Sequence, residues 1–386
     1  MSASVLPDSA SPPPAAGLPA RPPGRAVQGG LRGAQDAAVA PARAIEALLS
    51  TQAPGTPSVA RQLRLLIAAR LDALPWPASG HTLARWQALA AVAAHDLALA
   101  KLYEGHTDAL AVLHELQVAA PPAGSCLGMW AAEPPDGRVT FQRLPDGEVR
   151  LAGTKRWCSG AAHVSHGLLT AWPADAGAAE GEGPWLVLVD MQQPAVQVQP
   201  GAWCAVGMAD SQSLDVQLDG AIARLCGNAG DYLQRPGFWQ GGIGVAACWY
   251  GGCVALGRAL QRAVPAPGAA AGERGWLTQV ALGRADVELQ ALAALVRQAA
   301  AWVDAHPQHS AQALALQVRS AVDAAAQRLL VLTGRTLGAT PYCRDPHFAR
   351  LAADLPVFLR QTHADRDLAS LARLIDTPQE ADRWAL

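Results

Sequence analysis

The sequence of 386 residues lacks several features that would assign it to a class directly. Its seven cysteines form no C-x-x-C pair, and their odd number argues against both a zinc site and a secreted disulfide framework. No apolar run reaches the ~18 to 20 residues that span a bilayer, and no signal-peptide segment follows the amino terminus. These absences predict a soluble, cytoplasmic protein with reduced thiols, no metal site and no membrane partner.

An excess of positive charge is also missing. Lys and Arg number 30 against 32 Asp and Glu, and they are scattered along the chain. Because phosphate backbones are bound by clustered basic residues, nucleic acid is not an expected partner. No G-x-G-x-x-G follows a predicted strand, and no G-x-x-x-x-G-K-S/T occurs, so a Rossmann or P-loop nucleotide site is not expected either.

The composition that remains is globular, with 51% hydrophobic and 16% charged residues. Residues 1–40 are the exception, because they are rich in Pro and Ala and contain almost no large apolar residue. Such a segment cannot offset the entropy lost on ordering, which predicts a disordered tail rather than a targeting peptide.

The apolar pattern after the tail changes twice. Residues 41–122 repeat apolar residues at helical spacing, with a break at Pro75 and Pro77. Residues 123–232 contain short β-branched or aromatic segments, and we expect turns between them at Asp146-Gly147 and Asp219-Gly220. Residues 233–386 return to helical spacing and predict a four-helix bundle. The fold class predicted is therefore α+β, with a small β-barrel or sandwich between two helical domains.

Four stretches in this order resemble motifs of the acyl-CoA dehydrogenase family. Trp130-Ala-Ala-Glu-Pro134 is similar to the stretch that opens the family's β domain beside the flavin. Gly153-Thr-Lys-Arg-Trp-Cys-Ser-Gly160 is similar to the family's Gly-x-Lys-x-Trp-Ile-Thr segment. Val206 to Gly220 resembles the Gly-Met-Arg strand pair, and Asp345 to Arg373 occupies the place of the penultimate helix and catalytic loop.

This resemblance implies FAD, lying between the β domain and the carboxy-terminal helices. It also implies a homodimer or homotetramer, an electron-transfer partner, and an acyl-CoA or acyl-carrier-protein substrate from fatty acid metabolism. In such enzymes a carboxylate removes the α-proton of the thioester while the β-hydride passes to the flavin.

Carried onto this sequence, the motifs imply a set of cofactor-binding residues: Ala131, Ala132, Trp157, Cys158, Ser159, Arg335, Asp365 and Asp367. Trp157 could instead be a core aromatic, and Cys158 reads more simply as an inert packing thiol. Asp365 and Asp367 could equally cap a helix or pair with Arg360 and Arg366, and Arg335 could be solvated.

The segment Gly241 to Gly257 is rich in glycine and is predicted to be helical. Because glycine destabilises a helix relative to alanine, so many glycines need an explanation. The family's corresponding helix lines the acyl channel, which implies substrate contacts at Gly241, Gly244, Cys248 and Gly252. Tight helix packing is the alternative explanation.

The family's usual base, a Glu in a Tyr-Glu-Gly-Thr loop, is replaced by Gln361-Thr362-His363. His363 or Thr362 therefore occupies the catalytic position, and a neutral imidazole suits proton abstraction near neutral pH. The leading interpretation is an FAD-dependent dehydrogenase acting on the CH-CH bond of an acyl thioester with an atypical base. The Thr-His pair also resembles flavin monooxygenases of this fold, and a non-catalytic binding or assembly relative is a third possibility.

Overall fold

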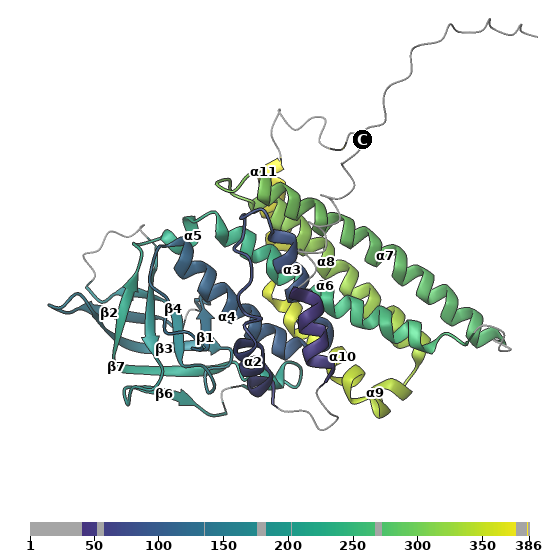
Figure 1. The fold of residues 1–386 in the computed structure, drawn as a ribbon, viewed down its shortest axis with the longest axis horizontal. Coiled ribbons are helices and arrows are strands. Elements are labelled where there is room, and N and C mark those ends of the chain that lie inside the picture. The colour runs from purple at the N-terminus through teal and green to yellow at the C-terminus, as the bar shows by residue number, and fades with distance from the viewer. Residues whose placement is uncertain are drawn as a thin grey trace, which may run out of the picture. The chain divides into compact units, whose positions relative to one another are not determined.

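Helices precede and follow a central block of strands, in the order predicted from the sequence (Figure 1). The computed structural model describes residues 41–51, 58–134, 136–175, 183–201, 203–266, 272–375 and 384, and they fall within the unit Ala38–Leu386. The α+β fold class, with a strand domain between helical regions, is confirmed. The tail predicted over residues 1–40 lies outside the described residues.

The first helical region contains a helical segment over residues 41–50, followed by α2 (Val59–Ala68), α3 (Thr82–His95) and α4 (Leu97–Glu115). Asp96 separates α3 from α4. Its extended backbone ends α3, and its carboxylate accepts a hydrogen bond from the main-chain nitrogen of Leu99 over 2.8 Å, which caps α4. The junction between the two helices is therefore fixed by one side chain.

The strands form one sheet that closes on itself. They are β1 (Leu127–Trp130), β2 (Val139–Arg143), β3 (Val149–Cys158), β4 (His166–Pro173), β5 (Trp185–Asp190), β6 (Val196–Gln199) and β7 (Leu214–Cys226). Pairings β4–β2, β2–β3, β3–β7, β7–β5 and β5–β4 complete a ring, while β1 joins β4 and β6 joins β7. This small barrel removes most free sheet edges.

One of the two predicted turns is wrong. Asp146-Gly147 does turn the chain between β2 and β3, where Gly147 has a φ of +88°. Asp219-Gly220 instead lies inside β7, opposite a register shift at Leu151/Ala152. Gly220 has a φ of +83°, and a glycine in that region supports a β-bulge as readily as a turn.

The carboxy-terminal region is helical. It contains α5 (Asp231–Gln234), α6 (Gly237–Ala263), α7 (Gly272–Ala305), α8 (Gln312–Leu337), α9 (Thr340–Arg344), α10 (Pro346–Phe358) and α11 (Asp365–Ile375). Helix α6 packs against α3, α4, α7, α8 and α10. By length and composition it is the one described helix that could cross a membrane, but 78% of its apolar window is buried inside the protein. A core helix of a folded domain has these properties.

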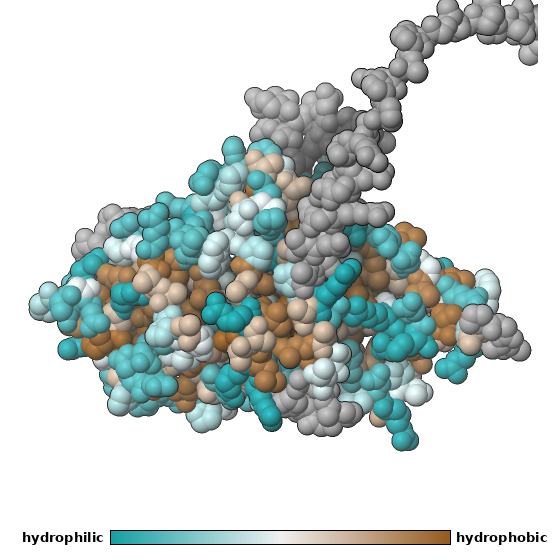
Figure 2. Space-filling model, in the orientation of Figure 1, coloured by the Kyte–Doolittle hydropathy of each residue, from teal (hydrophilic) through white to brown (hydrophobic). Residues whose placement is uncertain are grey.

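The surface mixes polar and apolar residues on the face drawn in Figure 2, with apolar areas near the end of α7. Two large apolar side chains of α7, Trp276 and Leu277, are 60% and 49% exposed. Most single exposed apolar residues need no explanation, but neighbouring ones indicate a contact surface.

Candidate functional site

The end of β3 presents Trp157 to solvent. The side chain is 55% exposed, and the backbone has a φ of +59°. A left-handed backbone is unusual for a large residue, and such conformations concentrate at functional sites. The main-chain nitrogen of Trp157 donates to Asp215 Oδ1 over 3.4 Å. Trp157 is therefore an exposed indole at a defined place on the barrel, and the alternative of a core aromatic is wrong.

The next residue, Cys158, turns inward. Its side chain is fully buried, and its thiol donates to the main-chain oxygen of Lys155 over 3.3 Å. Burial raises the pKa of this thiol well above its usual range, which makes it a poor nucleophile. A ligand on the Trp157 side of the strand could therefore contact Cys158 only through its main chain.

Ser159 begins a chain of three hydroxyl groups. Its Oγ lies 2.9 Å from Ser213 Oγ, which lies 3.0 Å from Ser211 Oγ. Ser211 Oγ donates to the main-chain oxygen of Met208 over 2.8 Å. Ser211 and Ser213 are buried, whereas Ser159 is half-buried. The Ser159 hydroxyl, predicted to face a flavin edge, is thus oriented by the loop before β7.

The segment after β1 holds Ala131 and Ala132, both half-buried, and then Glu133. Glu133 Oε1 lies 2.6 Å from the Nζ of Lys155, whose side chain is fully buried in the barrel. Thr170 also donates to this carboxylate, and Trp172 Nε1 donates to its other oxygen over 3.1 Å. Lys155 occupies an inward position of β3, where the strand pattern predicts an apolar residue. Its buried ion pair with Glu133 was not predicted from the sequence.

The protonation of this pair follows from its surroundings. Burial lowers the pKa of Lys155, although the hydrogen bond to Glu133 opposes the shift. Desolvation pushes the pKa of Glu133 up, but hydrogen bonds from Lys155 and Thr170 outweigh it and the pKa falls below its usual value. The close contact and the additional donors favour a salt bridge in which both groups are ionised.

The predicted catalytic residues follow a short 3-10 turn, η2 (Leu359–Gln361). Thr362 Oγ1 donates to the main-chain oxygen of Leu359 over 3.0 Å, so the hydroxyl hydrogen already has an acceptor. The side chain of His363 is 73% exposed, with Nδ1 3.5 Å from Asp367 Oδ1. Asp367 Oδ2 also accepts from the main-chain nitrogen of His363 over 3.0 Å. Asp367 thereby orients His363, while Asp365 is exposed at the start of α11.

Arg319 of α8 connects the loop that carries His363 to α6 by hydrogen bonds. Its guanidinium donates to the main-chain oxygens of Gly242 over 3.0 Å and Gln361 over 2.7 Å, and it lies 4.8 Å from the centre of the Trp249 ring. Desolvation lowers its pKa. No sequence pattern indicated this role, because an arginine within a helical pattern is usually solvated.

The glycines of α6 mostly allow close helix packing. A Cβ on Gly244 would lie 3.3 Å from Leu89, and one on Gly252 would lie 3.2 Å from Leu355. A Cβ on Gly251 would overlap the main-chain oxygen of Ala90 in α3. Cys248 is fully buried, and desolvation raises its pKa. Packing therefore accounts for Gly244 and Gly252, whereas Gly241 faces a carboxylate.

That carboxylate belongs to a charged face of α4. Lys101, Glu104 and Asp108 recur at helical spacing, and Lys101 Nζ lies 3.0 Å from Glu104 Oε2. A Cβ on Gly241 would lie 3.1 Å from Asp108 Oδ1. Burial raises the pKa of Asp108, and this residue has no hydrogen bond or ion pair within the described part of the chain. A long apolar chain between α4 and α6 would contact charged groups here.

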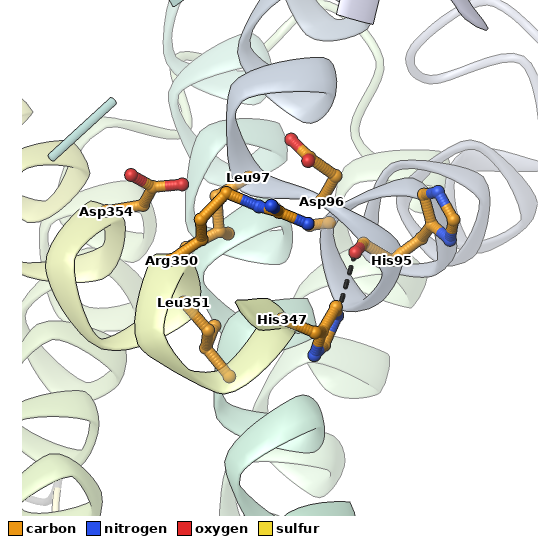
Figure 3. A pocket seen from close by; sticks show the side chains of 8 residues that line it. His95, Asp96, Leu97, His347, Arg350, Leu351 and Asp354 are labelled. Carbon is orange, nitrogen blue, oxygen red and sulfur yellow. Dashed lines mark hydrogen bonds between the residues drawn. The ribbon is translucent and has the colours of Figure 1, made fainter. Parts of the chain in front are cut away.

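Asp354 of α10 connects the helical region to the barrel. Its Oδ1 accepts from the main-chain nitrogen of Met208 over 2.6 Å, and the residue is 7% exposed. Beside it lies a cavity of about 10 Å³, room for roughly one water, between α10 and the α3–α4 junction (Figure 3). His347 Nε2 lies 2.9 Å from the main-chain oxygen of His95 across this junction.

Asp354 is expected to make stability depend on pH. Desolvation, opposed by the Met208 hydrogen bond, raises its pKa to about 6, above the ~3.9 of an unfolded chain. The folded state therefore holds this proton more tightly, and the ionised carboxyl destabilises the fold above about pH 6. We expect Asp354→Asn to raise the unfolding free energy by about 1–3 kcal/mol near pH 8, and this gain to disappear near about pH 4.

Urea unfolding across this pH range measures the effect. Asp286→Asn, an exposed aspartate of α7, serves as the control and should change little at any pH. A gain in Asp354→Asn that is equal at all pH values would contradict the assignment of the cost to ionisation.

Arg335 lies at a separate place, in the last turn of α8. It lines a groove of about 680 Å³ between α7 and α8, together with Arg274, Arg284 and Trp276. These three arginines have no ion pair among the residues that the structure describes, whereas Arg328 in the same groove pairs with Glu288 over 2.8 Å. The groove combines free positive charge with exposed apolar surface.

The described residues bring some predicted positions together and leave others apart. Trp157 and Ser159 share one edge of the barrel, and Thr362 with His363 forms the loop after α10. Hydrogen bonds through Ser213, Ser211, Met208 and Asp354 connect Ser159 to α10, the helix that precedes this loop. Arg335 lies elsewhere, and Cys248 is inside the bundle. No group of three or more metal-ligating side chains occurs in the described ranges.

Comparison with known proteins gives a match in structure alone. No family model matches the sequence, and no curated protein matches it. KijD3, solved with FMN and dTDP-3-amino-2,3,6-trideoxy-4-keto-3-methyl-D-glucose, is 18% identical with a TM-score of 0.68, over 92% of this chain and 97% of that one. TdsC from Paenibacillus sp. A11-2, solved with FMN and indole, is 21% identical with a TM-score of 0.66, over 89% and 96%.

Butyryl-CoA dehydrogenase from Megasphaera elsdenii is 14% identical with a TM-score of 0.68, over 88% of this chain and 97% of that one. Identities at this level show the fold. The chain thus has the acyl-CoA dehydrogenase fold, as the four sequence stretches indicated.

Proposed function

We propose that this chain, which has the acyl-CoA dehydrogenase fold, is a flavin-dependent oxidoreductase. The observation that carries the proposal is Trp157, an exposed aromatic with a left-handed backbone beside the Ser159 hydroxyl. An exposed indole offers a flat apolar face for an isoalloxazine ring, and the hydroxyl offers a polar contact at its edge. Two proteins of similar structure were solved with FMN.

The residues present fit such a cofactor. Trp157 would pack on the ring, Ser159 would hydrogen-bond to its edge, and the main chain at Ala131 and Ala132 lies at the exit of β1 on the same domain. When bound, a flavin takes up a hydride from a substrate or, once reduced, passes electrons to oxygen. Around it this chain supplies the ring contacts, the proton acceptor at His363 and the fixed loop that carries it.

We further propose that the reaction uses oxygen and a polar substrate, rather than dehydrogenating a fatty acyl thioester. The charged face of α4 supports this choice, since Asp108 lies beside Gly241 of α6, where an acyl chain was expected, and Lys101 and Glu104 pair on the same helix. Desolvating such groups against an alkyl chain is unfavourable. The absence of a carboxylate between Phe238 and Arg258 agrees with it, because no family base is available there.

FAD and a homo-oligomer remain part of the proposal. The α7–α8 groove offers Arg274, Arg284 and Arg335 without ion-pair partners in the described chain, and guanidinium groups bind phosphate in a bidentate manner. A pyrophosphate carried by a second copy of the chain would satisfy these charges. FMN, with a single phosphate, would leave more of them unpaired.

The test begins with the visible spectrum of the purified protein titrated with FAD and with FMN. A protein that binds neither contradicts the proposal.

With flavin bound, anaerobic addition of short- and long-chain acyl-CoA thioesters tests dehydrogenation, because a competent thioester bleaches the flavin. Bleaching by an acyl-CoA would overturn the choice of an oxygen-using reaction. Chemically reduced flavin mixed with oxygen and a polar substrate should instead give an oxygenated product.

Trp157→Ala is expected to weaken flavin binding by about 1–3 kcal/mol, because apolar contact area and stacking are both lost. The side chain is exposed, so the unfolding free energy of the apoprotein should change by less than about 0.5 kcal/mol. Isothermal titration with FAD and FMN measures the first quantity and urea unfolding the second. Trp157→Phe keeps an aromatic face and should retain most of the affinity. Earlier unfolding with unchanged affinity would identify Trp157 as a structural residue.

A further inference from the structure

Helix α10 meets the loop before β7 at two adjacent residues. Asp354 accepts from the Met208 main chain, and Gly207 packs so closely that a Cβ there would overlap the main-chain oxygen of Ala353. The two segments are 146 residues apart in sequence. Only a glycine allows this approach, so the contact is specified from both sides.

The loop that Asp354 holds is strained. Met208 has a φ of +59° and Gln212 a φ of +41°, and neither is a glycine. A non-glycine residue in the left-handed region persists only where its surroundings fix it. For Met208 those surroundings include Asp354 on its nitrogen, and Ser211 Oγ and Trp203 Nε1, 2.8 and 3.0 Å from its oxygen. Its side chain is buried.

From Met208 the hydrogen bonds lead to the proposed flavin edge. Ser211 bridges Met208 to Ser213, and Ser213 contacts the Ser159 hydroxyl. The main-chain oxygen of Ser211 also accepts from the nitrogen of Gly160 over 2.8 Å, which holds the end of β3 in place. The same helix α10 leads through η2 to His363. One carboxylate therefore links α10, the helix that precedes the His363 loop, to the hydrogen bonds that reach the strand end carrying Trp157.

We propose that Asp354 is a positioning residue for the flavin site: by holding Met208 in its left-handed conformation, it aims the Ser159 hydroxyl and sets the spacing between β3 and the His363 loop. This inference rests on the proposed function. Among the described hydrogen bonds and ion pairs, Asp354 contacts neither the predicted ring contacts nor His363, and it acts through Met208.

The charged groups around Asp354 do not replace it. Asp96, at the α3–α4 junction, and Asp210, in η1 (Ala209–Ser211), raise its pKa, and Arg350, one turn earlier on α10, lowers it. His95 and His347 line the neighbouring cavity, and His347 Nε2 lies within hydrogen-bond distance of the main-chain oxygen of His95 (Figure 3). Asp354 is the residue whose side chain accepts from the Met208 nitrogen.

The experiment compares Asp354→Ala, Asp354→Asn and Ser211→Ala with the wild-type chain. Asn keeps an oxygen acceptor for Met208, whereas Ala removes it and leaves a buried amide unsatisfied. We expect Asp354→Ala to weaken FAD or FMN binding about tenfold, Asp354→Asn to stay within about twofold, and Ser211→Ala to fall between them. Hydrogen exchange across residues 206–213 should speed up in Asp354→Ala and should not speed up in Asp354→Asn.

The outcomes separate this inference from the proposed function. If the wild type binds neither flavin, the proposed function fails, and the hydrogen exchange of residues 206–213 still tests whether Asp354 holds the loop. If the wild type binds flavin and Asp354→Ala binds it equally well, with only a lower melting temperature, Asp354 is a structural anchor and the inference is overturned. Equal weakening in Asp354→Asn and Asp354→Ala would also overturn it, because the acceptor oxygen would then be irrelevant.

Discussion

Glu133→Ala is expected to lower the free energy of unfolding by about 3–5 kcal/mol, because it strands the Lys155 ammonium inside the barrel. Lys155 is fully buried, and Glu133 is its only carboxylate contact among the described ion pairs. Thr170 would remain as a hydrogen-bond acceptor, but a hydroxyl does not neutralise a charge. Urea denaturation followed by circular dichroism measures the loss.

The matched control removes both charges. In Glu133→Ala combined with Lys155→Met, no charge is left unpaired, and much of the lost stability should return. Glu133→Gln keeps an oxygen acceptor and should cost less than the alanine substitution. A loss below about 1 kcal/mol in Glu133→Ala would mean that water reaches Lys155 or that the amine is neutral in the barrel.

His363→Gln is expected to lower kcat by about 10²- to 10⁴-fold if the imidazole accepts a proton in the reaction. Glutamine keeps the size and the hydrogen-bonding capacity of the side chain but cannot act as a base. Flavin affinity should be unchanged, since His363 is exposed on the loop and Asp367 is its described partner. Single-turnover kinetics measure the step, with whichever acyl-CoA thioester or polar substrate the cofactor experiments identify.

Two neighbouring variants separate His363 from the alternatives. Thr362→Val should have little effect on kcat, because the Thr362 hydroxyl already donates to the Leu359 main chain. Asp367→Asn should lower kcat less than His363→Gln, because it removes a charge that orients the ring but leaves the base in place. Full activity in His363→Gln would exclude the residue from the chemistry and favour Asp365 or a bound water.

The positions carried over from the motifs lie in different surroundings in the structure. Trp157 could be singled out because its flanking Lys, Ser and Gly form a specific pattern, and the structure exposes it. The neighbouring Cys158 could not be placed by the same motif, because which face of a strand a residue occupies depends on local bulges, and β3 has one between Lys155 and Cys158. The glycines of α6 had two interpretations from the sequence, substrate contact and helix packing. The neighbours of Gly244 and Gly252 in the structure, Leu89 and Leu355, favour packing.

The sequence by itself determined the order of helices and strands and the class of fold, because apolar periodicity is a local property of the chain. Tertiary structure alone decided that Lys155 meets Glu133, that Arg319 reaches Gln361 and that Asp354 holds Met208. Each of these pairs joins residues far apart in sequence, and each depends on how the barrel and the helices pack together. A charged residue in a helical or strand pattern reads as solvated until its neighbours are known, since burial and partners, rather than spacing, give it a role.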